Sequence, residues 1–312
     1  MPFNQKPLTF NAKINTVTVG TGEKAIVIGG NHTLPLCGFD GASENTAKIG
    51  IEISDLGQNS SEGIRAYYAD CADMGEVAKR AASTEGVDFV ALLLEGGDPN
   101  GENRSVEELI AVVREVAGAV DCPLVVQGCR NVEKDAELLP KVAEALQGRN
   151  AVIMSEKEEN YKTIGAAAGL AYGQIVAAES SVDINLAKQL NVITTQLGVD
   201  PKRVIMNIGS AAAGYGYEYV ASTMDRVKAA ALGQGDNMLQ MPIITPVASE
   251  TWATKEASAS EEEAPEWGSQ EERGIEMEIE TAVADLVSGS DAVILRHPVS
   301  IATVAKLIRE LA

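Results

Sequence analysis

Small polar groups and carboxylates follow a series of short apolar runs, where an α/β protein places groups that meet a ligand. Among them, Glu95, Glu156 and Glu179 could act as general bases, although structural carboxylates are the more ordinary interpretation. The remaining groups are mostly small or amide-bearing and offer hydrogen bonds rather than strong acids. The segments that follow the apolar runs and carry these groups are residues 95–98, 127–129, 155–156, 179–181, 207–209, 245–247 and 296–297. The pattern therefore predicts a binding surface more readily than a proton-transfer site.

The chain contains two histidines, His32 and His297. A G-x-S-x-G nucleophile turn and an H-E-x-x-H zinc motif are both absent, which speaks against a serine hydrolase and a zinc protease. His297 lies in Arg-His-Pro and fits either a packed histidine or a polar contact to an anionic ligand group. The D-x-H-x-x-G motif, whose histidine binds cobalt, is also absent.

The four cysteines form no C-x-x-C pair, so neither an iron–sulfur site nor a disulfide framework is expected; they are Cys37, Cys71, Cys122 and Cys129. Cys37 and Cys129 are interpreted as small buried residues. A reduced cytoplasmic protein is the default for such cysteine usage.

Composition narrows the class of partner. Acidic residues number 45 against 25 basic ones, which gives a formal net charge of −20, and aromatic residues are 4% of the chain. This charge repels phosphate backbones and anionic lipid, so we expect neither nucleic acid nor a membrane as a partner. No apolar run is long enough to span a bilayer.

Seven nearly continuous apolar runs predict strands buried on both faces: residues 88–94, 123–127, 151–154, 174–178, 203–207, 241–245 and 292–296. An eighth strand lies at 25–30 or at 48–53, and the other run joins 16–19 in an N-terminal hairpin. Eight strands alternating with helices favour a single (β/α)8 TIM barrel over residues 1–312. The alternative, an open doubly wound sheet, lacks its glycine fingerprint here.

Several helix ends carry specific signals. Ser105 and Glu108 form a capping box, and Asp183 begins a helix that Gly198 ends. Gly148 and Gly233 end two further helices, and the last helix is expected over residues 300–311.

Two segments depart from this regular pattern. Residues 1–47 form the hairpin extension, and residues 253–272 form an acidic loop insertion containing Trp267. A solvated loop accounts for the glutamate run, whereas a tryptophan in a polar loop usually packs somewhere, which makes the loop a candidate partner contact. The small-residue turn at 211–217 could cradle a large flat ligand or be a flexible loop.

Distinctive segments spread along the chain resemble one family: residues 29–35 (GGNHTLP), 127–135 (QGCRNVEKD), 159–161 (ENY), 183–185 (DIN) with 187–188 (AK), 214–219 (GYGYEY), 235–243 (GDNMLQMPI), 250–252 (ETW), 267–268 (WG), 273–274 (RG), 280–282 (ETA) and 296–298 (RHP). In this order they resemble the small (delta) subunit of the corrinoid/iron–sulfur protein of the reductive acetyl-CoA (Wood–Ljungdahl) pathway. This is the CO dehydrogenase/acetyl-CoA synthase delta subunit family.

The resemblance implies a (β/α)8 barrel in a heterodimer that serves anaerobic carbon fixation. The large subunit would carry the iron–sulfur cluster and a corrinoid domain, and cobalamin would lie between that domain and this barrel. Its cobalt would accept a methyl group from methyltetrahydrofolate through a methyltransferase and donate it to acetyl-CoA synthase. A reductive activator is a further implied partner. This chain would then be a methyl-carrier subunit rather than a catalyst on its own.

Within that interpretation, six residues are candidates for cobalamin contact: Asn207, Gly209, Tyr215, Gly216, Thr245 and Thr251. No catalytic or metal-binding residue is assigned. Two alternatives remain open. One is a stand-alone pterin-dependent TIM-barrel methyltransferase, in which Asn207 and Glu95 would contact the pterin, and the other is a scaffold within a larger assembly.

Overall fold

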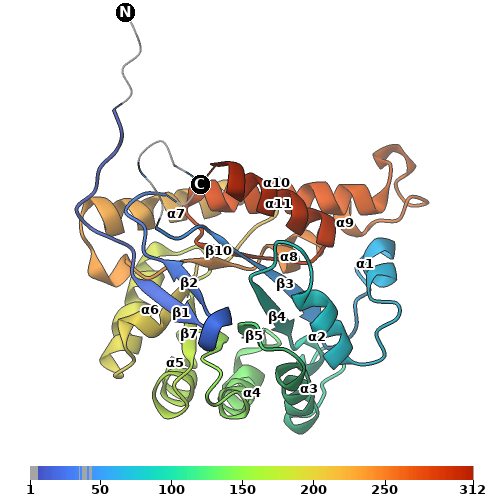
Figure 1. Ribbon diagram of the computed structural model, residues 1–312, viewed down its shortest axis with the longest axis horizontal. Coiled ribbons are helices and arrows are strands. Elements are labelled where there is room, and N and C mark those ends of the chain that lie inside the picture. Colours follow the sequence, from blue (N-terminus) through green and yellow to red (C-terminus); the bar gives the residue numbers. More distant parts are fainter. Residues whose placement is uncertain (1–5, 35, 37–40, 42–43, 312) are drawn as a thin grey trace, which may run out of the picture.

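The computed structural model describes residues 6–34, 36, 41 and 44–311. Eight parallel strands form one sheet, in the order β8-β7-β6-β5-β4-β3-β10-β9 (Figure 1). The strands are β3 (Lys48–Ser54), β4 (Phe89–Leu93), β5 (Leu124–Gln127), β6 (Val152–Glu156), β7 (Ile175–Glu179), β8 (Val204–Asn207), β9 (Ile244–Thr245) and β10 (Ala292–Leu295). The outer strands meet at a parallel bridge between Met206 and Ile243, which nearly closes the barrel. The predicted (β/α)8 fold is confirmed.

Helices surround this sheet, and each strand-to-strand connection contains at least one of them (Figure 1). They are α1 (Glu62–Tyr67), α2 (Met74–Ala82), α3 (Val106–Ala119), α4 (Val132–Ala145), α5 (Tyr161–Ile164), α6 (Ile184–Gln196), α7 (Tyr217–Lys228), α8 (Val247–Thr251), α9 (Lys255–Ser258), α10 (Gln270–Ser288) and α11 (Pro298–Leu311). Single turns add η1 (Gly22–Lys24), η2 (Glu95–Gly97), η4 (Pro201–Arg203), η6 (Asn237–Leu239) and η7 (Pro265–Trp267), and π-helical segments η3 (Gly165–Ala171) and η5 (Ala229–Gly233) extend α5 and α7.

The helix ends follow their sequence signals. The Ser105 hydroxyl accepts the backbone N–H of Glu108 at 3.3 Å, while the Glu108 carboxylate accepts that of Ser105 at 2.8 Å, so the capping box is confirmed. Asp183 caps α6, and Gly198 beyond its end has a φ of +113°, which a residue with a side chain rarely adopts. Gly148 follows α4, Gly233 ends η5, and the last helix begins two residues before the predicted position.

The structure distinguishes between the two candidates for the first barrel strand. Residues 48–54 form β3, between β10 and β4, whereas β1 (Thr16–Val19) and β2 (Ile26–Gly29) form an antiparallel hairpin. All of β3 after its first residue is buried, as a strand covered on both faces requires. Val17, Val19 and Ile28 of the hairpin pack against the barrel interior near the amino ends of the strands. The β1–β2 hairpin therefore covers this end of the barrel.

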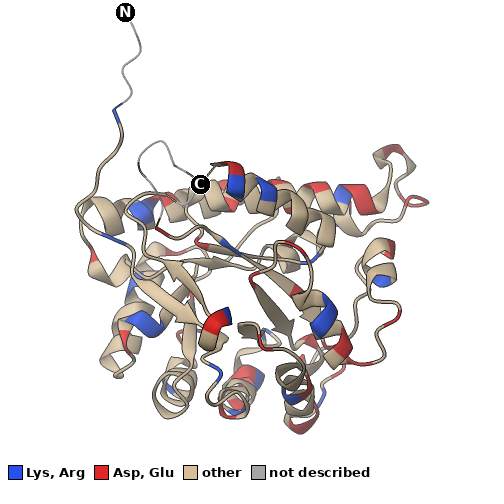
Figure 2. Cartoon of the chain, viewed as in Figure 1, with Lys and Arg blue, Asp and Glu red and all other residues tan. Residues whose placement is uncertain are grey.

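The predicted loop insertion at 253–272 is partly wrong, because it contains regular structure. Thr254 caps α9, and Ser269 caps α10, which begins at Gln270. The remainder projects from the barrel with acidic residues at its tip (Figure 2). The cations of Lys255 and Arg273 lie over the Trp267 ring, at 5.4 and 5.5 Å from its centre, so this tryptophan packs locally.

Candidate functional site

A cavity of about 270 Å³ opens at the carboxyl ends of β5 to β8. We call it the mouth cavity; its lining includes Gln127, Ser155, Glu179, Asn207, Gly209 and Glu250. A second cavity of about 450 Å³, here the side cavity, adjoins it and includes Glu95, Cys129, Ser249, Trp252 and Arg296. Arg130 lines both. Together they make the carboxyl end of the barrel a broad hollow lined by both polar and apolar groups.

Asn207, at the end of β8, organises the mouth cavity. Its amide nitrogen donates to the Ser155 hydroxyl at 2.9 Å and, more weakly, to Glu179 at 3.4 Å, and its oxygen accepts the backbone N–H of Gly209 at 3.0 Å. Lys157 forms an ion pair with Glu179 at 3.0 Å. These contacts hold amide, hydroxyl and carboxylate groups along one wall.

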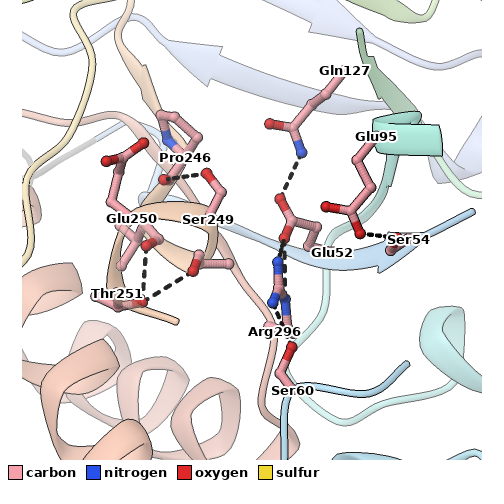
Figure 3. A network of polar contacts seen from close by, with 12 residues as sticks. Glu52, Ser54, Ser60, Glu95, Gln127, Pro246, Ser249, Glu250, Thr251 and Arg296 are labelled. Carbon is pink, nitrogen blue, oxygen red and sulfur yellow. Dashed lines mark hydrogen bonds and ion pairs between the residues drawn. The ribbon is translucent and has the colours of Figure 1, made fainter. Parts of the chain in front are cut away.

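A buried ion pair fixes the strands beneath the hollow (Figure 3). The Glu52 carboxylate is 1% exposed and accepts hydrogen bonds from Arg296 at 2.5 and 3.1 Å and from the Gln127 amide at 2.8 Å. Arg296 also donates to the Ser60 hydroxyl at 2.5 Å. Burial would lower the pKa of Arg296, but Glu52 more than compensates and raises it, so the guanidinium remains charged. The network joins β10, β3 and β5.

The three predicted bases occupy different environments. Glu95 lies in the side cavity and accepts a hydrogen bond from the Ser54 hydroxyl at 2.5 Å. Glu179 lies in the mouth cavity beside Lys157. Glu156 does not lie at the rim. It is fully buried against Thr194 of α6, because the β6–β7 register shifts between Met154 and Glu156. Burial raises the pKa of Glu156 to about 8.

Of the six candidate contact residues, Asn207 and Gly209 line the mouth cavity. Thr245 and Thr251 do not present their hydroxyls to it, because both residues are fully buried. The Thr245 hydroxyl bonds with that of Ser290, and the Thr251 hydroxyl donates to carbonyls of its own helix α8 (Figure 3).

Tyr215 and Gly216 lie outside the cavity lining, in the turn before α7. Tyr215 is 50% exposed, and its hydroxyl donates to Glu256 of α9. Gly216, the N-cap residue just before α7, has a φ of +89°, so the chain can turn sharply there. The turn at 211–217 thus contacts the projecting insertion.

His297 is buried, as its packed interpretation expects. Its Nδ1 accepts the backbone N–H of Val299 at 3.1 Å, so the neutral ring carries its proton on Nε2, which lies 3.0 Å from Glu271. The ring stacks on Trp252 at 6.1 Å. His297 therefore organises the start of α11 rather than facing the mouth cavity.

Cys129 is also buried, whereas Cys37 lies outside the described residues. Burial raises the pKa of the Cys129 thiol to about 12. Within the described part of the chain, no group of three or more histidine, cysteine or carboxylate side chains could hold a metal ion.

Sequence reasoning missed several residues that line the hollow, and two of them come from one short segment of the chain. Arg130 lines both cavities, and Asp135, at the first turn of α4, is a buried residue of the mouth cavity whose pKa is raised by burial. Both residues belong to the family-like segment 127–135, which was the available signal.

None of the described helices is both long and apolar enough to cross a membrane.

Comparisons with known proteins identify the family. The family model for the CO dehydrogenase/acetyl-CoA synthase delta subunit matches residues 16–298. The chain is 31% identical over 299 residues to the acetyl-CoA decarbonylase/synthase complex subunit delta of Archaeoglobus fulgidus, covering 94% of this chain and 65% of that protein. The corresponding Methanothermobacter thermautotrophicus subunit is 29% identical over 313 residues, covering 99% and 77%. The chain thus spans about two thirds to three quarters of the length of these relatives.

Solved structures support the fold alone. Dihydropteroate synthase from Stenotrophomonas maltophilia gives a TM-score of 0.53 at 12% identity, covering 85% of this chain and 92% of that one. The Thermus thermophilus enzyme gives 0.53 at 11% identity, covering 95% and 100%. Because the family model matches residues 16–298, this chain belongs to the CO dehydrogenase/acetyl-CoA synthase delta subunit family.

Proposed function

We propose that this chain is a complex subunit that encloses a cobalt corrinoid at the carboxyl end of its barrel. The observation that carries the proposal is the broad hollow, lined by polar and apolar groups, that the mouth and side cavities form. A ligand lying across it would meet amide and hydroxyl groups, whereas Glu95 and Glu179, two of the bases considered, are held by Ser54 and Lys157. Such a surface suits binding better than proton transfer.

The residues of the hollow fit such a group. A cavity of about 270 Å³ is at the small end of the usual range for ligand pockets, so a macrocycle would cover the opening rather than enter it. The peripheral carboxamides of a corrin need donors and acceptors, which Asn207, Ser155 and Arg130 supply. When bound, the cobalt would accept and release the methyl group. The contribution of this chain is to position the ring edge and to exclude water from one face.

The partners follow from the same proposal. The large subunit would hold the cluster and the corrinoid domain, and methyltetrahydrofolate methyltransferase, acetyl-CoA synthase and a reductive activator would approach the cobalt in turn. The names of the archaeal relatives describe subunits of an acetyl-CoA decarbonylase/synthase complex. A stable heterodimer of this kind would bury more than about 2,000 Å².

The test is to combine this chain with its large subunit loaded with hydroxocobalamin, to reduce the cobalt to cobalt(I) with a chemical reductant, and to follow its reoxidation in the corrinoid spectrum. We expect the chain to slow oxidation of the reduced cobalt at least about tenfold, because it shields one face of the ring. Asn207→Ala should weaken this protection, whereas Glu159→Ala, an exposed change outside the cavity lining, should leave it unchanged. A complex whose corrinoid is equally accessible with and without this chain would refute the proposal.

A pterin-dependent methyltransferase is the second candidate. Asn207 and Glu95, the pair expected to contact a pterin, lie in different cavities, but Asp135 joins Asn207 in the mouth cavity, which is of a size for a small heterocycle. Methyl transfer from methyltetrahydrofolate to free cobalamin by the isolated chain would favour this candidate. Its absence, together with corrinoid protection in the complex, would favour the first.

A further inference from the structure

Arg130 belongs to the linings of both the mouth cavity and the side cavity. Its side chain is 53% exposed, and its charged partner there is Glu250 of α8, at 3.8 Å. Glu250 also lines the mouth cavity. The pair is therefore located where a ligand covering both cavities would rest.

The backbone places Arg130 there at some cost. Its φ is +69°, in the left-handed region that residues with side chains seldom adopt. The buried Asp135 carboxylate holds this turn, because it accepts the backbone N–H of Cys129 at 2.8 Å and also that of Arg130. Non-glycine residues in this conformation are concentrated at binding sites, where the surrounding structure compensates for the strain.

The Arg130–Glu250 pair is looser than the neighbouring pairs. Lys157 lies 3.0 Å from Glu179, and Arg296 lies 2.5 Å from Glu52. Arg130 makes no side-chain hydrogen bond to any other described residue, which leaves its guanidinium donors available. Burial raises the pKa of Glu250, and Glu179 and Glu52 add to that effect, whereas Arg130 opposes it. An exposed pair of this length contributes little stability, so a ligand opens it easily.

We propose that the Arg130–Glu250 pair opens to receive one primary carboxamide of the ligand. The amide oxygen accepts from the Arg130 guanidinium, and the amide nitrogen donates to the Glu250 carboxylate. A carboxylate at the same position would bind Arg130 but would be repelled by Glu250. An ammonium group would bind Glu250 but would be repelled by Arg130. The pair therefore selects a neutral amide. This inference rests on the proposed function, because it assumes that the ligand is a carboxamide-bearing corrinoid.

The experiment uses this chain with its large subunit and two kinds of probe. The first is hydroxocobalamin, and the second is a set of derivatives in which each peripheral carboxamide in turn is replaced by a carboxylate. The affinity of the chain for the loaded large subunit is measured for each probe. We expect one derivative to weaken binding about tenfold through repulsion by Glu250. Glu250→Gln should restore binding of that derivative alone.

Arg130→Gln should weaken binding of the hydroxocobalamin form about tenfold, because it removes a charged donor. Arg114→Gln, which removes the same charge from the exposed face of α3, is the matched control and should have no effect. Equal binding of all derivatives, or equal binding by Arg130→Gln and the control, overturns the inference and leaves corrinoid enclosure standing. If the unaltered complex does not slow oxidation of the reduced cobalt, the proposed function itself fails.

Discussion

At the scale of single residues, two buried carboxyl groups lie outside the linings of the mouth and side cavities. The Thr194 hydroxyl donates a hydrogen bond to the Glu156 carboxyl group, and the Ser210 hydroxyl donates one to the Asp285 carboxyl group at 3.0 Å. The second oxygen of each carboxyl group has no hydrogen-bond partner. Burial raises the pKa of both to about 8. Both groups are therefore mostly protonated at neutral pH, and their charge is linked to stability rather than to ligand binding.

Glu156 makes the free energy of unfolding depend on pH. The folded chain keeps a proton that the unfolded chain releases between about pH 4.5 and 8, so stability is highest below this window and falls as the pH rises through it. The contribution of Glu156 to the slope is at most about 1.4 kcal/mol per pH unit. Glu156→Gln should flatten the profile, as measured by urea unfolding at several pH values. The exposed Glu159→Gln is the control, and an unchanged slope in Glu156→Gln would contradict the assignment.

At the scale of elements, a glycine and an aromatic ring share the barrel interior where β3 meets β4. Gly50 is paired in register with Phe89, and a Cβ added at Gly50 would lie 2.1 Å from the Phe89 ring. Phe89 is fully buried among the interior residues of the barrel. The absence of a side chain at Gly50 is thus a packing requirement, because the ring occupies that space.

Gly50→Ala should lower the free energy of unfolding by about 1–3 kcal/mol, since the ring and the strand must move apart. Gly118→Ala is the matched change in an exposed position of α3, with no atom within 4 Å of the new Cβ. It should instead stabilise the protein by about 0.5–1 kcal/mol, because alanine favours the helix. Thermal and urea unfolding of both variants would check this, and equal effects would show that the contact with Phe89 is unimportant.

At the scale of the whole molecule, the two ends of the barrel differ. The β1–β2 hairpin covers the amino end with Val17, Val19 and Ile28, and the Asn150 side chain binds the hairpin backbone at Thr18 at 2.7 Å. The carboxyl end carries the mouth and side cavities. One end therefore serves stability, and the other is available for a ligand, as is usual for this fold.

Neighbouring residues of the hairpin test this division. Val17→Thr buries a hydroxyl in the apolar interior and should cost about 1–3 kcal/mol of unfolding free energy. Thr18→Val changes the same atoms on the exposed side and should have an effect near zero. Neither variant should alter corrinoid protection in the folded complex. Similar losses in the two variants would contradict the plugging role of the hairpin.

Local sequence patterns were enough to predict most of the strands, several helix starts and the family of this protein. Continuous apolar runs predicted the buried parallel strands, and Ser105, Glu108 and Asp183 marked helix starts, because strand burial and capping depend on neighbours in the chain. The family was likewise identifiable from short segments in order. Asn207 and Gly209 were found because residues at the ends of barrel strands converge.

Tertiary structure alone decided the rest. The Glu156 side chain points away from the barrel interior toward α6, because the register of β6 shifts between Met154 and Glu156. The Thr245 hydroxyl is bonded to that of Ser290, which lies just before β10. The assignment of residues 48–54 to the barrel depends on pairing with β10, more than 200 residues away. Arg130 joins two cavities through a turn held by Asp135. Such placements arise from long-range packing, which neither residue type nor periodicity specifies.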